Sequence, residues 1–252
     1  MKNTKNSRKK IIVNSLIGLF LIVIVVGGWL FFSRPKAQST ADSWSVMQRK
    51  KEITIGLDDT FIPMGFRSKS GKIIGFDVDL ADAAFKKIGL KVKWEPINWA
   101  TKERLLNNGQ IDAIWNGYTI SPARKKKVAF SIPYKKGTQV LVTLTKDNIN
   151  RISDMQGRKL GLQNASTADT QFRQYKNLLR RYVAGTPNKY DTFDKAFMDL
   201  KAGRIQGILV DSIYAGYYIR NLSDPQDYKI ISAGYPIDEN GVGFRKMIGP
   251  FV

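Results

Sequence analysis

Cysteine and histidine are both absent from this chain of 252 residues. Without cysteine, the chain has no disulfide framework, no thiolate metal site and no cysteine nucleophile. Without histidine, it lacks the commonest general base and the commonest metal ligand. An enzyme would have to work with Asp, Glu, Lys or Tyr. The composition therefore favours a protein that is not an enzyme, and it calls for no cofactor.

Acidic residues are missing from the N-terminus, where residues 1–10 carry five cations. Residues 11–32 then contain no charge and end in Trp29, Phe31 and Phe32, as an aromatic belt would. This run has the length of a bilayer span, about 20 residues, and exceeds the apolar region of a signal peptide, roughly 7–15 residues. We predict a cytoplasmic tail at 1–10, a transmembrane anchor at 11–32 and an extracellular body. A cleaved signal and a secreted body are the alternative.

The net charge of +20 is spread unevenly along the chain. The first 51 residues hold ten Lys or Arg and one acid. In the body, cations are scattered or form short runs such as Lys125-Lys126-Lys127, and no nucleic-acid-binding motif accompanies them. We therefore predict no nucleic-acid partner. A solvated surface that faces an anionic cell wall or leaflet explains the charge more simply.

Beyond a polar segment at 33–51, predicted as a tether, the pattern alternates between strands and helices. Strands are expected at 53–57, 91–95, 111–115, 139–145, 159–162 and 205–210. Helices are expected at 76–88, 167–179, 191–203 and 212–220, and one begins at 101–106. This alternation predicts α/β structure with parallel sheets. Its restart after residue 145 predicts two lobes.

The helix expected at 76–88 carries apolar side chains at helical spacing. We predict that one face of this helix is formed by Phe76, Leu80, Ala83, Ala84 and Ile88. Gly89 is expected to end it.

The stretch W-N-G-Y-T-I-S-P-A-R at 115–124 follows a short apolar strand. Gly117 lets the backbone approach a ligand closely. Thr119 and Ser121 offer hydroxyls, and Arg124 offers a planar fork of donors that matches a carboxylate. The stretch therefore indicates a carboxylate-binding loop. The alternative is a surface loop with a solvated Arg.

Other polar and aromatic side chains also follow predicted strands, where open α/β sheets bind ligands. Asp58 and Asp211 can each hold a cationic group, and Phe61 and Trp99 can form apolar walls. The segment Q-N-A-S-T-A at 163–168 opens a helix whose free N–H groups suit an anion.

Each of these features has a structural alternative. Asp58, Ser166 and Asp211 are also suited to capping turns or helices, and Trp99 to a place in the core. Taken together, however, an Arg for a carboxylate, an Asp for an ammonium and aromatic walls complement an α-amino acid.

Several stretches resemble the amino-acid solute-binding proteins of ABC importers, the group that contains the glutamine-, histidine- and lysine/arginine/ornithine-binding proteins. The similarity covers residues 50–246 and is carried by residues 55–66, 71–81, 109–134, 155–167 and 241–245. The resemblance implies a two-lobed periplasmic-binding-protein-like clamshell with crossing hinge strands. Lobe 1 would comprise 52–138 plus 238–252, and lobe 2 would comprise 139–237.

The resemblance also assigns roles within the site. Arg124 would bind the α-carboxylate with Thr119 and with N–H groups near Ser166 and Thr167. Asp211 and the Gly117 carbonyl would bind the α-ammonium, Phe61 and Trp99 would sandwich the ligand side chain, and Asp58 would contact its polar or cationic end. The predicted ligand-binding residues are Asp58, Phe61, Trp99, Asn116, Gly117, Thr119, Arg124, Gln163, Ser166, Thr167 and Asp211.

Two departures from the family pattern stand out. Asn116-Gly117 replaces the commoner Ser/Gly pair, so glutamine, arginine, lysine, histidine and cystine all remain candidate ligands. The family also continues past the stretch at 241–245 with helix that packs on lobe 1, whereas this chain ends at Val252 and its Gly249-Pro250 would break a helix. We therefore expect a truncated C-terminus that leaves apolar surface of lobe 1 exposed.

The predicted function is capture of a polar or cationic amino acid by a monomer outside the cell, followed by delivery to the membrane subunits of an ABC permease. A dehydratase of cyclic acids on the same scaffold is one alternative, although it would need a general acid or base without histidine. A basic module that binds cell-wall polymers is another.

Overall fold

The computed structural model describes residues 40–246. The predicted cytoplasmic tail and transmembrane anchor lie outside this range, as do residues 247–252. Among the described residues, no helix is both long and apolar enough to cross a membrane. Part of the predicted tether is ordered, because Thr40–Lys50 forms helix α2 and Met47 packs against apolar residues of the first sheet.

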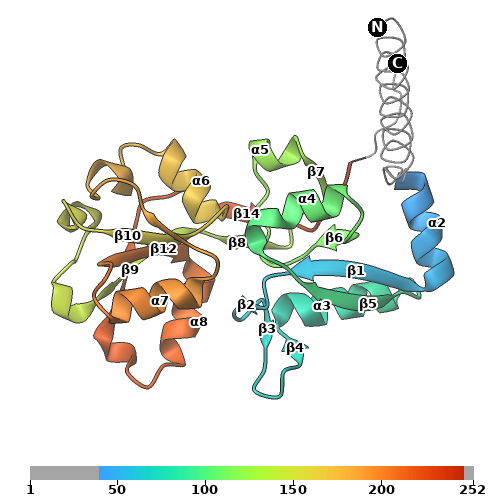
Figure 1. Ribbon diagram of the computed structural model, residues 1–252, viewed down its shortest axis with the longest axis horizontal. Helices are drawn as coiled ribbons and strands as arrows, with labels where there is room; N and C mark the ends of the chain where they lie inside the picture. The colour runs from blue at the N-terminus through green and yellow to red at the C-terminus, as the bar shows by residue number, and fades with distance from the viewer. Residues whose placement is uncertain (1–39, 247–252) are drawn as a thin grey trace, which may run out of the picture. The chain divides into compact units, whose positions relative to one another are not determined.

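The first sheet has the strand order β5-β1-β6-β15-β7 (Figure 1). In that order, the bounds are Lys91–Pro96, Glu52–Leu57, Ala113–Ile114, Gly243–Arg245 and Val128–Phe130. A small sheet follows β1, with strands β2 (Thr60–Phe61), β3 (Gly65–Arg67) and β4 (Ile73–Ile74). The helices of this part are α3 (Phe76–Lys86), α4 (Lys102–Asn107) and α5 (Pro122–Lys125). We call these elements lobe 1.

The second sheet has the order β11-β10-β12-β9-β13. In that order, the bounds are Asn188–Tyr190, Leu160–Gln163, Gly207–Asp211, Gln139–Leu144 and Tyr228–Ser232. Its helices are α6 (Thr167–Gln174), α7 (Phe193–Lys201) and α8 (Ser212–Arg220). Short 3-10 helices in the described part of the chain lie at Trp99–Thr101, Thr145–Asp147, Ile152–Met155, Leu179–Arg181 and Pro225–Asp227. We call the elements from β9 to β13 lobe 2.

A short antiparallel pair joins the two lobes. Strand β8 (Lys135–Gly137) pairs with β14 (Asp238–Asn240), with Gly137 opposite Asp238. The chain passes from β8 into β9 of lobe 2 and returns through β14 into β15 of lobe 1. The two sheets are thus connected through this pair, which lies between them in Figure 1.

Both sheets are mixed, and the expectation of parallel sheets was wrong. β1 is parallel to β5 and β6, and β10 is parallel to β11 and β12. By contrast, β15 is antiparallel to β6 and β7, and β9 is antiparallel to β12 and β13. The reason lies in the connections. β9 and β15 enter their sheets from the joining pair and not through a βα crossover, which is what keeps neighbouring strands parallel.

Helix α3 buries a different face from the one predicted. Its buried residues are Asp77, Val78, Ala81 and Phe85, whereas Phe76 is 53% exposed. Asp77 accepts hydrogen bonds from Gly117 N and from the Tyr134 hydroxyl, which orients this side of the helix inward. The apolar spacing allowed either face, and a buried polar contact selected one of them.

Helix α6 is shorter than predicted and ends at Gln174. Tyr175 leaves helical geometry (φ −95°, ψ 79°), and its ring makes an edge contact with Tyr235 at a centroid distance of 5.9 Å. Helix α7 follows its sequence pattern, because Phe193, Ala196, Phe197 and Leu200 are all buried at helical spacing. The packing of lobe 2 therefore decides where α6 ends.

Candidate functional site

A small cavity lies where β1, β6, β10 and β12 end, between lobe 1 and lobe 2. It encloses about 30 Å³ of space for solvent, little more than one or two water molecules need. Its lining residues are Asp58, Phe61, Trp99, Asn116, Gly117, Thr119, Gln139, Gln163, Ser166, Thr167, Phe193 and Asp211. Every residue of the predicted ligand-binding set except Arg124 is in this lining, and Arg124 contacts two members of it.

Asp58 follows β1 and is buried at the floor of the cavity. Its Oδ1 accepts hydrogen bonds from Thr60 N (3.0 Å) and the Thr60 hydroxyl (2.7 Å), the turn-capping role that is common for Asp. Its Oδ2 accepts a bond of 2.6 Å from Gln163 Nε2 of lobe 2. Burial raises the pKa of Asp58, and these hydrogen bonds oppose the rise. Asp58 therefore both shapes its own turn and joins the lobes.

The loop after β6 presents Asn116, Gly117 and Thr119 to the cavity. Asn116 Oδ1 accepts a bond from Asp58 N at 3.1 Å, which links this loop to the end of β1. Gly117 has φ +59°, and a Cβ there would lie 2.8 Å from Phe61 Cε1. The position thus requires glycine for its backbone conformation and for the close approach of Phe61.

Arg124 lies in α5 with its side chain buried. Nη1 donates to Thr119 O (3.1 Å) and to Thr167 Oγ1 (3.2 Å), and Nη2 donates to Ala165 O (3.3 Å). The guanidinium also stacks 4.6 Å above the Tyr118 ring. Within residues 40–246 it forms no ion pair, and burial lowers its pKa. A desolvated guanidinium held only by neutral oxygens is suited to an anionic partner.

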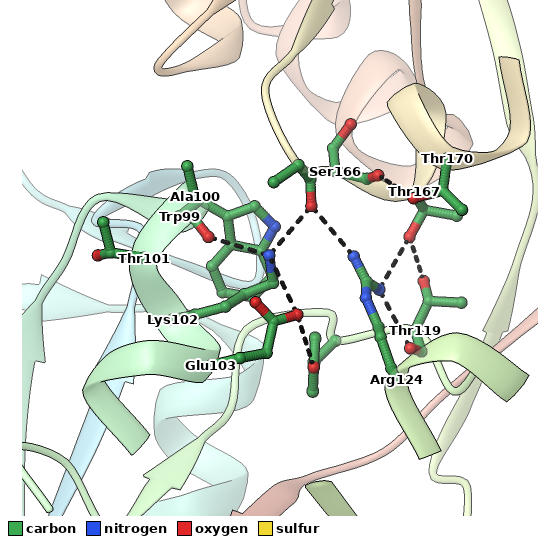
Figure 2. A network of polar contacts seen from close by, with 12 residues as sticks. Trp99, Ala100, Thr101, Lys102, Glu103, Thr119, Arg124, Ser166, Thr167 and Thr170 are labelled. Carbon is green, nitrogen blue, oxygen red and sulfur yellow. Dashed lines mark hydrogen bonds and ion pairs between the residues drawn. The ribbon is translucent and has the colours of Figure 1, made fainter. Parts of the chain in front are cut away.

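The N-terminus of α6 faces this guanidinium from lobe 2 (Figure 2). Ser166 is the N-cap, and its Oγ accepts a bond from Asp169 N at 3.2 Å. Thr167 Oγ1 contacts Thr119 Oγ1 at 2.8 Å as well as Arg124. The capping role proposed as an alternative for Ser166 is therefore present, and it satisfies one of the free N–H groups in the first turn of the helix.

Asp211 ends β12 and also combines two roles. Its Oδ1 accepts a bond of 2.9 Å from Ile213 N and so caps α8. Its Oδ2 lies 3.8 Å from the ammonium of Lys135 in β8. The carboxylate belongs to the cavity lining, so lobe 2 contributes one buried acid to the site.

The two predicted aromatic walls differ in their surroundings. Phe61 stacks against Tyr214 of lobe 2 at a centroid distance of 5.4 Å and lies 6.1 Å from Phe193. Trp99 makes an edge contact with Tyr118 and carries the ammonium of Lys102 4.8 Å from its ring centroid. One face of Trp99 is therefore already occupied by a cation.

Sequence reasoning missed four residues at or beneath the site. Gln139 and Phe193 line the cavity, while Asp77 and Lys102 are fully buried next to it. Burial raises the pKa of Asp77 to about 6, against hydrogen bonds from Gly117 N and Tyr134. Gln139 follows the joining strand β8 and Phe193 opens α7, so neither follows a predicted strand end. For Lys102, the only signal in the sequence was Trp99, three residues earlier, whose ring can attract a cation.

Comparison with known proteins gives consistent matches. The family described as bacterial extracellular solute-binding proteins, family 3, matches residues 53–215. The L-cystine-binding protein TcyJ of Escherichia coli (strain K12) is 30% identical over 92% of this chain and 83% of its own. A substrate-binding protein of an ABC uptake transporter from Streptococcus pneumoniae, solved with bound histidine, is 44% identical with a TM-score of 0.79 and covers 82% of this chain and 85% of its own. An ancestral arginine-binding protein bound to arginine is 33% identical with a TM-score of 0.70 and covers 78% of this chain and 85% of its own.

Proposed function

Because the chain belongs to the family 3 bacterial extracellular solute-binding proteins, whose members bind solutes and are not enzymes, we propose that it captures one polar or cationic amino acid outside the cell and delivers it to an ABC permease. The observation that carries this proposal is the buried Arg124. It donates a hydrogen bond to Thr167 at the N-terminus of α6 (Figure 2), next to a cavity whose lining includes Thr167 and the acid Asp211. An anion site and a cationic-group site in one cleft complement the two charges of an α-amino acid.

The site residues take the following roles in this proposal. The ligand carboxylate binds Arg124, with Thr119 and the first turn of α6 completing its hydrogen bonds. The ammonium binds Asp211 and the Gly117 carbonyl, an oxygen that now accepts a bond of 3.1 Å from Asn240 Nδ2. Asn116 and Gln163 fix the walls of the pocket, and Asp58 meets the far end of the ligand side chain.

Phe61 and Trp99 enclose the ligand side chain, and the two lobes separate to admit it. The motion is needed because residues of both lobes line the cavity, so a ligand has to pass between the lobes to reach it. The joining pair of β8 and β14 is the natural hinge, since it is the path by which the chain crosses between the sheets. A ligand that bonds to both lobes favours the closed form by its differential affinity.

The class of ligand follows from the pocket and from the relatives. Those relatives bind cystine, histidine and arginine by their names. A buried Asp58 next to the amide of Gln163 offers an acceptor to a side chain that carries a donor. We therefore propose a ligand with a polar or cationic end, bound by lobe 1 at 52–138 plus 238–252 and by lobe 2 at 139–237. Residues 11–32 would anchor this body to the membrane, with residues 1–10 in the cytoplasm.

A thermal-shift screen tests the proposal. At a hundredfold excess over Kd, a bound ligand adds about 2.7 kcal/mol to the free energy of unfolding, which corresponds to a rise of roughly 5–10 °C in Tm for a chain of this size. The panel is arginine, lysine, histidine, glutamine and cystine, with leucine and aspartate as mismatched controls. Folded protein that no amino acid stabilises would refute the proposal.

A further inference from the structure

Lys102, the first residue of α4, is an ammonium buried between the lobes. Its side chain has no exposed surface. Nζ donates to Trp99 O at 2.9 Å within lobe 1 and to Ala165 O at 3.0 Å in lobe 2. Figure 2 shows the ammonium of Lys102 and the guanidinium of Arg124 side by side beneath the segment that carries Ser166 and Thr167.

The carbonyl of Ala165 is the point at which these two cations converge. It accepts from Lys102 Nζ at 3.0 Å and from Arg124 Nη2 at 3.3 Å. Ala165 has φ +54°, a left-handed conformation that is uncommon for a residue with a Cβ, and directly precedes Ser166, the N-cap of α6. The position of this carbonyl therefore sets the direction in which α6 begins.

The charges around Lys102 make it a costly choice for packing alone. Burial, together with the nearby charges of Arg124 and Lys127, lowers its pKa to about 7. Glu103 opposes this from 3.7 Å, but Glu103 Oε1 also accepts a bond from the Tyr118 hydroxyl at 3.1 Å. The ring of Trp99 adds a cation–π contact. An apolar side chain would fill the same space without the desolvation cost, so the buried cation calls for a functional explanation.

We propose that Lys102 is a positioning residue of the ligand site. It holds the Ala165 carbonyl against lobe 1. In this way it keeps the first turn of α6 opposite Arg124, at the separation that one ligand carboxylate bridges. The inference rests on the proposed function. When a ligand carboxylate takes the guanidinium, Ala165 O loses its bond from Arg124, and Lys102 keeps that carbonyl satisfied and in place.

Lys102 thus acts through Ala165 and not by touching the ligand, because its ammonium donates to the carbonyls of Trp99 and Ala165. It also connects the anchoring of the carboxylate to the closed arrangement of the lobes. Its bond to Ala165 O joins lobe 1 to lobe 2 one residue before the N-cap that faces the carboxylate.

The first measurement uses the full chain with Lys102→Met and, as a matched control, Lys126→Met, which removes an exposed cation of the same lobe. Calorimetry compares L-arginine with L-argininamide and L-histidine with L-histidinamide. Lys102→Met should weaken binding of the amino acid about tenfold or more and that of its amide less than about threefold, because the amide has no carboxylate to position. Lys126→Met should leave the affinities for the amino acid and for its amide at the wild-type values.

The second measurement needs no ligand. Because the chain has no native cysteine, Asn107→Cys in α4 and Gln174→Cys in α6 place one spin label on each lobe at exposed sites. Lys102→Met should shift the distance distribution toward longer values, and Lys126→Met should not. Lys102→Gln, which is neutral but keeps a donor, replaces the Met variant if that variant does not fold.

The outcomes separate this inference from the proposed function. If wild-type protein binds none of these amino acids, the proposed function fails, and the distance measurement still decides the role of Lys102. If binding is intact but Lys102→Met changes neither the distances nor the affinity for the amino acid, the role of Lys102 is overturned and the proposed function stands. An equal loss for amino acid and amide with unchanged distances is a purely structural effect and also overturns it.

Discussion

Lobe 1 and lobe 2 face one cavity with different chemistry. Among the described residues, both buried cations, Lys102 and Arg124, belong to lobe 1, together with the buried acids Asp58 and Asp77. Lobe 2 buries Asp169 and Asp211, and it supplies most of the aromatic rings of a core cluster that also contains Phe61 and Met64 of lobe 1. To the cleft it presents the carbonyl of Ala165, the hydroxyls of Ser166 and Thr167, two glutamine amides and the one acid Asp211.

In the proposed site, lobe 1 would provide most of the fixed charges for recognition, and lobe 2 would close over them with neutral groups and the one acid Asp211. Charges held within one rigid lobe keep their geometry whether or not the cleft is closed. Neutral groups on the moving lobe can be solvated and desolvated at lower cost than charges.

Removing Arg124 should abolish tight binding. Arg124→Ala takes the guanidinium from a desolvated ligand carboxylate and should weaken binding by about 2–5 kcal/mol. Asp211→Asn should cost less, because its Oδ1 can still accept from Ile213 N and keep α8 capped. Calorimetry measures both, and Lys125→Ala, an exposed neighbour in α5, is the control. A larger loss for Asp211→Asn than for Arg124→Ala would reverse the proposed division.

Gly117 should tolerate alanine less well than a glycine of equal conformation in lobe 2. Gly117 and Gly185 both have φ +59°, but only at Gly117 would a Cβ meet a neighbour, Phe61 Cε1 at 2.8 Å. Gly185→Ala should lower the free energy of unfolding by about 1–2 kcal/mol, and Gly117→Ala by about 2–4 kcal/mol because overpacking is added. Denaturant titration compares the two. Equal losses of unfolding free energy in the two variants would show that the Phe61 ring moves aside at no measurable cost.

Asp77 should make the folded chain less stable as the pH rises from 4 to 6. Its pKa is raised from 3.8 to about 6, so between these values the folded state binds more protons than the unfolded state. The free energy of unfolding therefore falls across this window, by at most about 3 kcal/mol from Asp77.

Asp77→Asn should flatten that fall, measured by denaturant titration at pH 4, 5, 6 and 7. Asp238 also has its pKa raised to about 6 by burial and accounts for a remaining slope in the same direction. The exposed Asp79→Asn in the same helix is the control. An unchanged slope in Asp77→Asn would exclude Asp77 as its source.

The smallest expected difference is between two serine residues that cap helices. Ser121 Oγ accepts from Arg124 N and Ser166 Oγ accepts from Asp169 N, both at 3.2 Å. Replacing either by alanine should cost about 1 kcal/mol of stability. Only Ser166 lines the cavity, so Ser166→Ala should also weaken amino-acid binding while Ser121→Ala changes it little. Equal binding losses in calorimetry would mean that both caps act only through stability.

Local patterns were sufficient for most elements and for most of the residues that line the cavity. Helix α8 occupies the predicted 212–220, and β1, β5 and β12 overlap their predicted ranges. The predicted site residues follow strand ends, and strand ends meet at one edge of an α/β sheet. This is why the cavity contains the predicted Asp58, Trp99 and Asp211. Their roles toward a ligand remain predictions.

Other features depend on contacts between distant parts of the chain. The inward face of α3 is set by Asp77 bonding to Gly117, forty residues away in sequence. The antiparallel entry of β9 and β15 depends on the crossings between lobes, which leave no local signature. Gln139 and Phe193 reach the cavity only because lobe 2 is placed against lobe 1.

Residue types and short spacings were enough for the alternation of strands and helices, for the lack of cysteine and histidine chemistry, and for the pattern ending at Arg124 that is predicted to bind a carboxylate. These depend on residue type and short spacing, which the chain specifies locally. Tertiary packing was needed to bury Lys102, to bring Ala165 O to both Lys102 and Arg124, and to place Asp58 against Gln163. Each of these contacts spans at least forty residues of sequence, and their geometry exists only once the two lobes are packed.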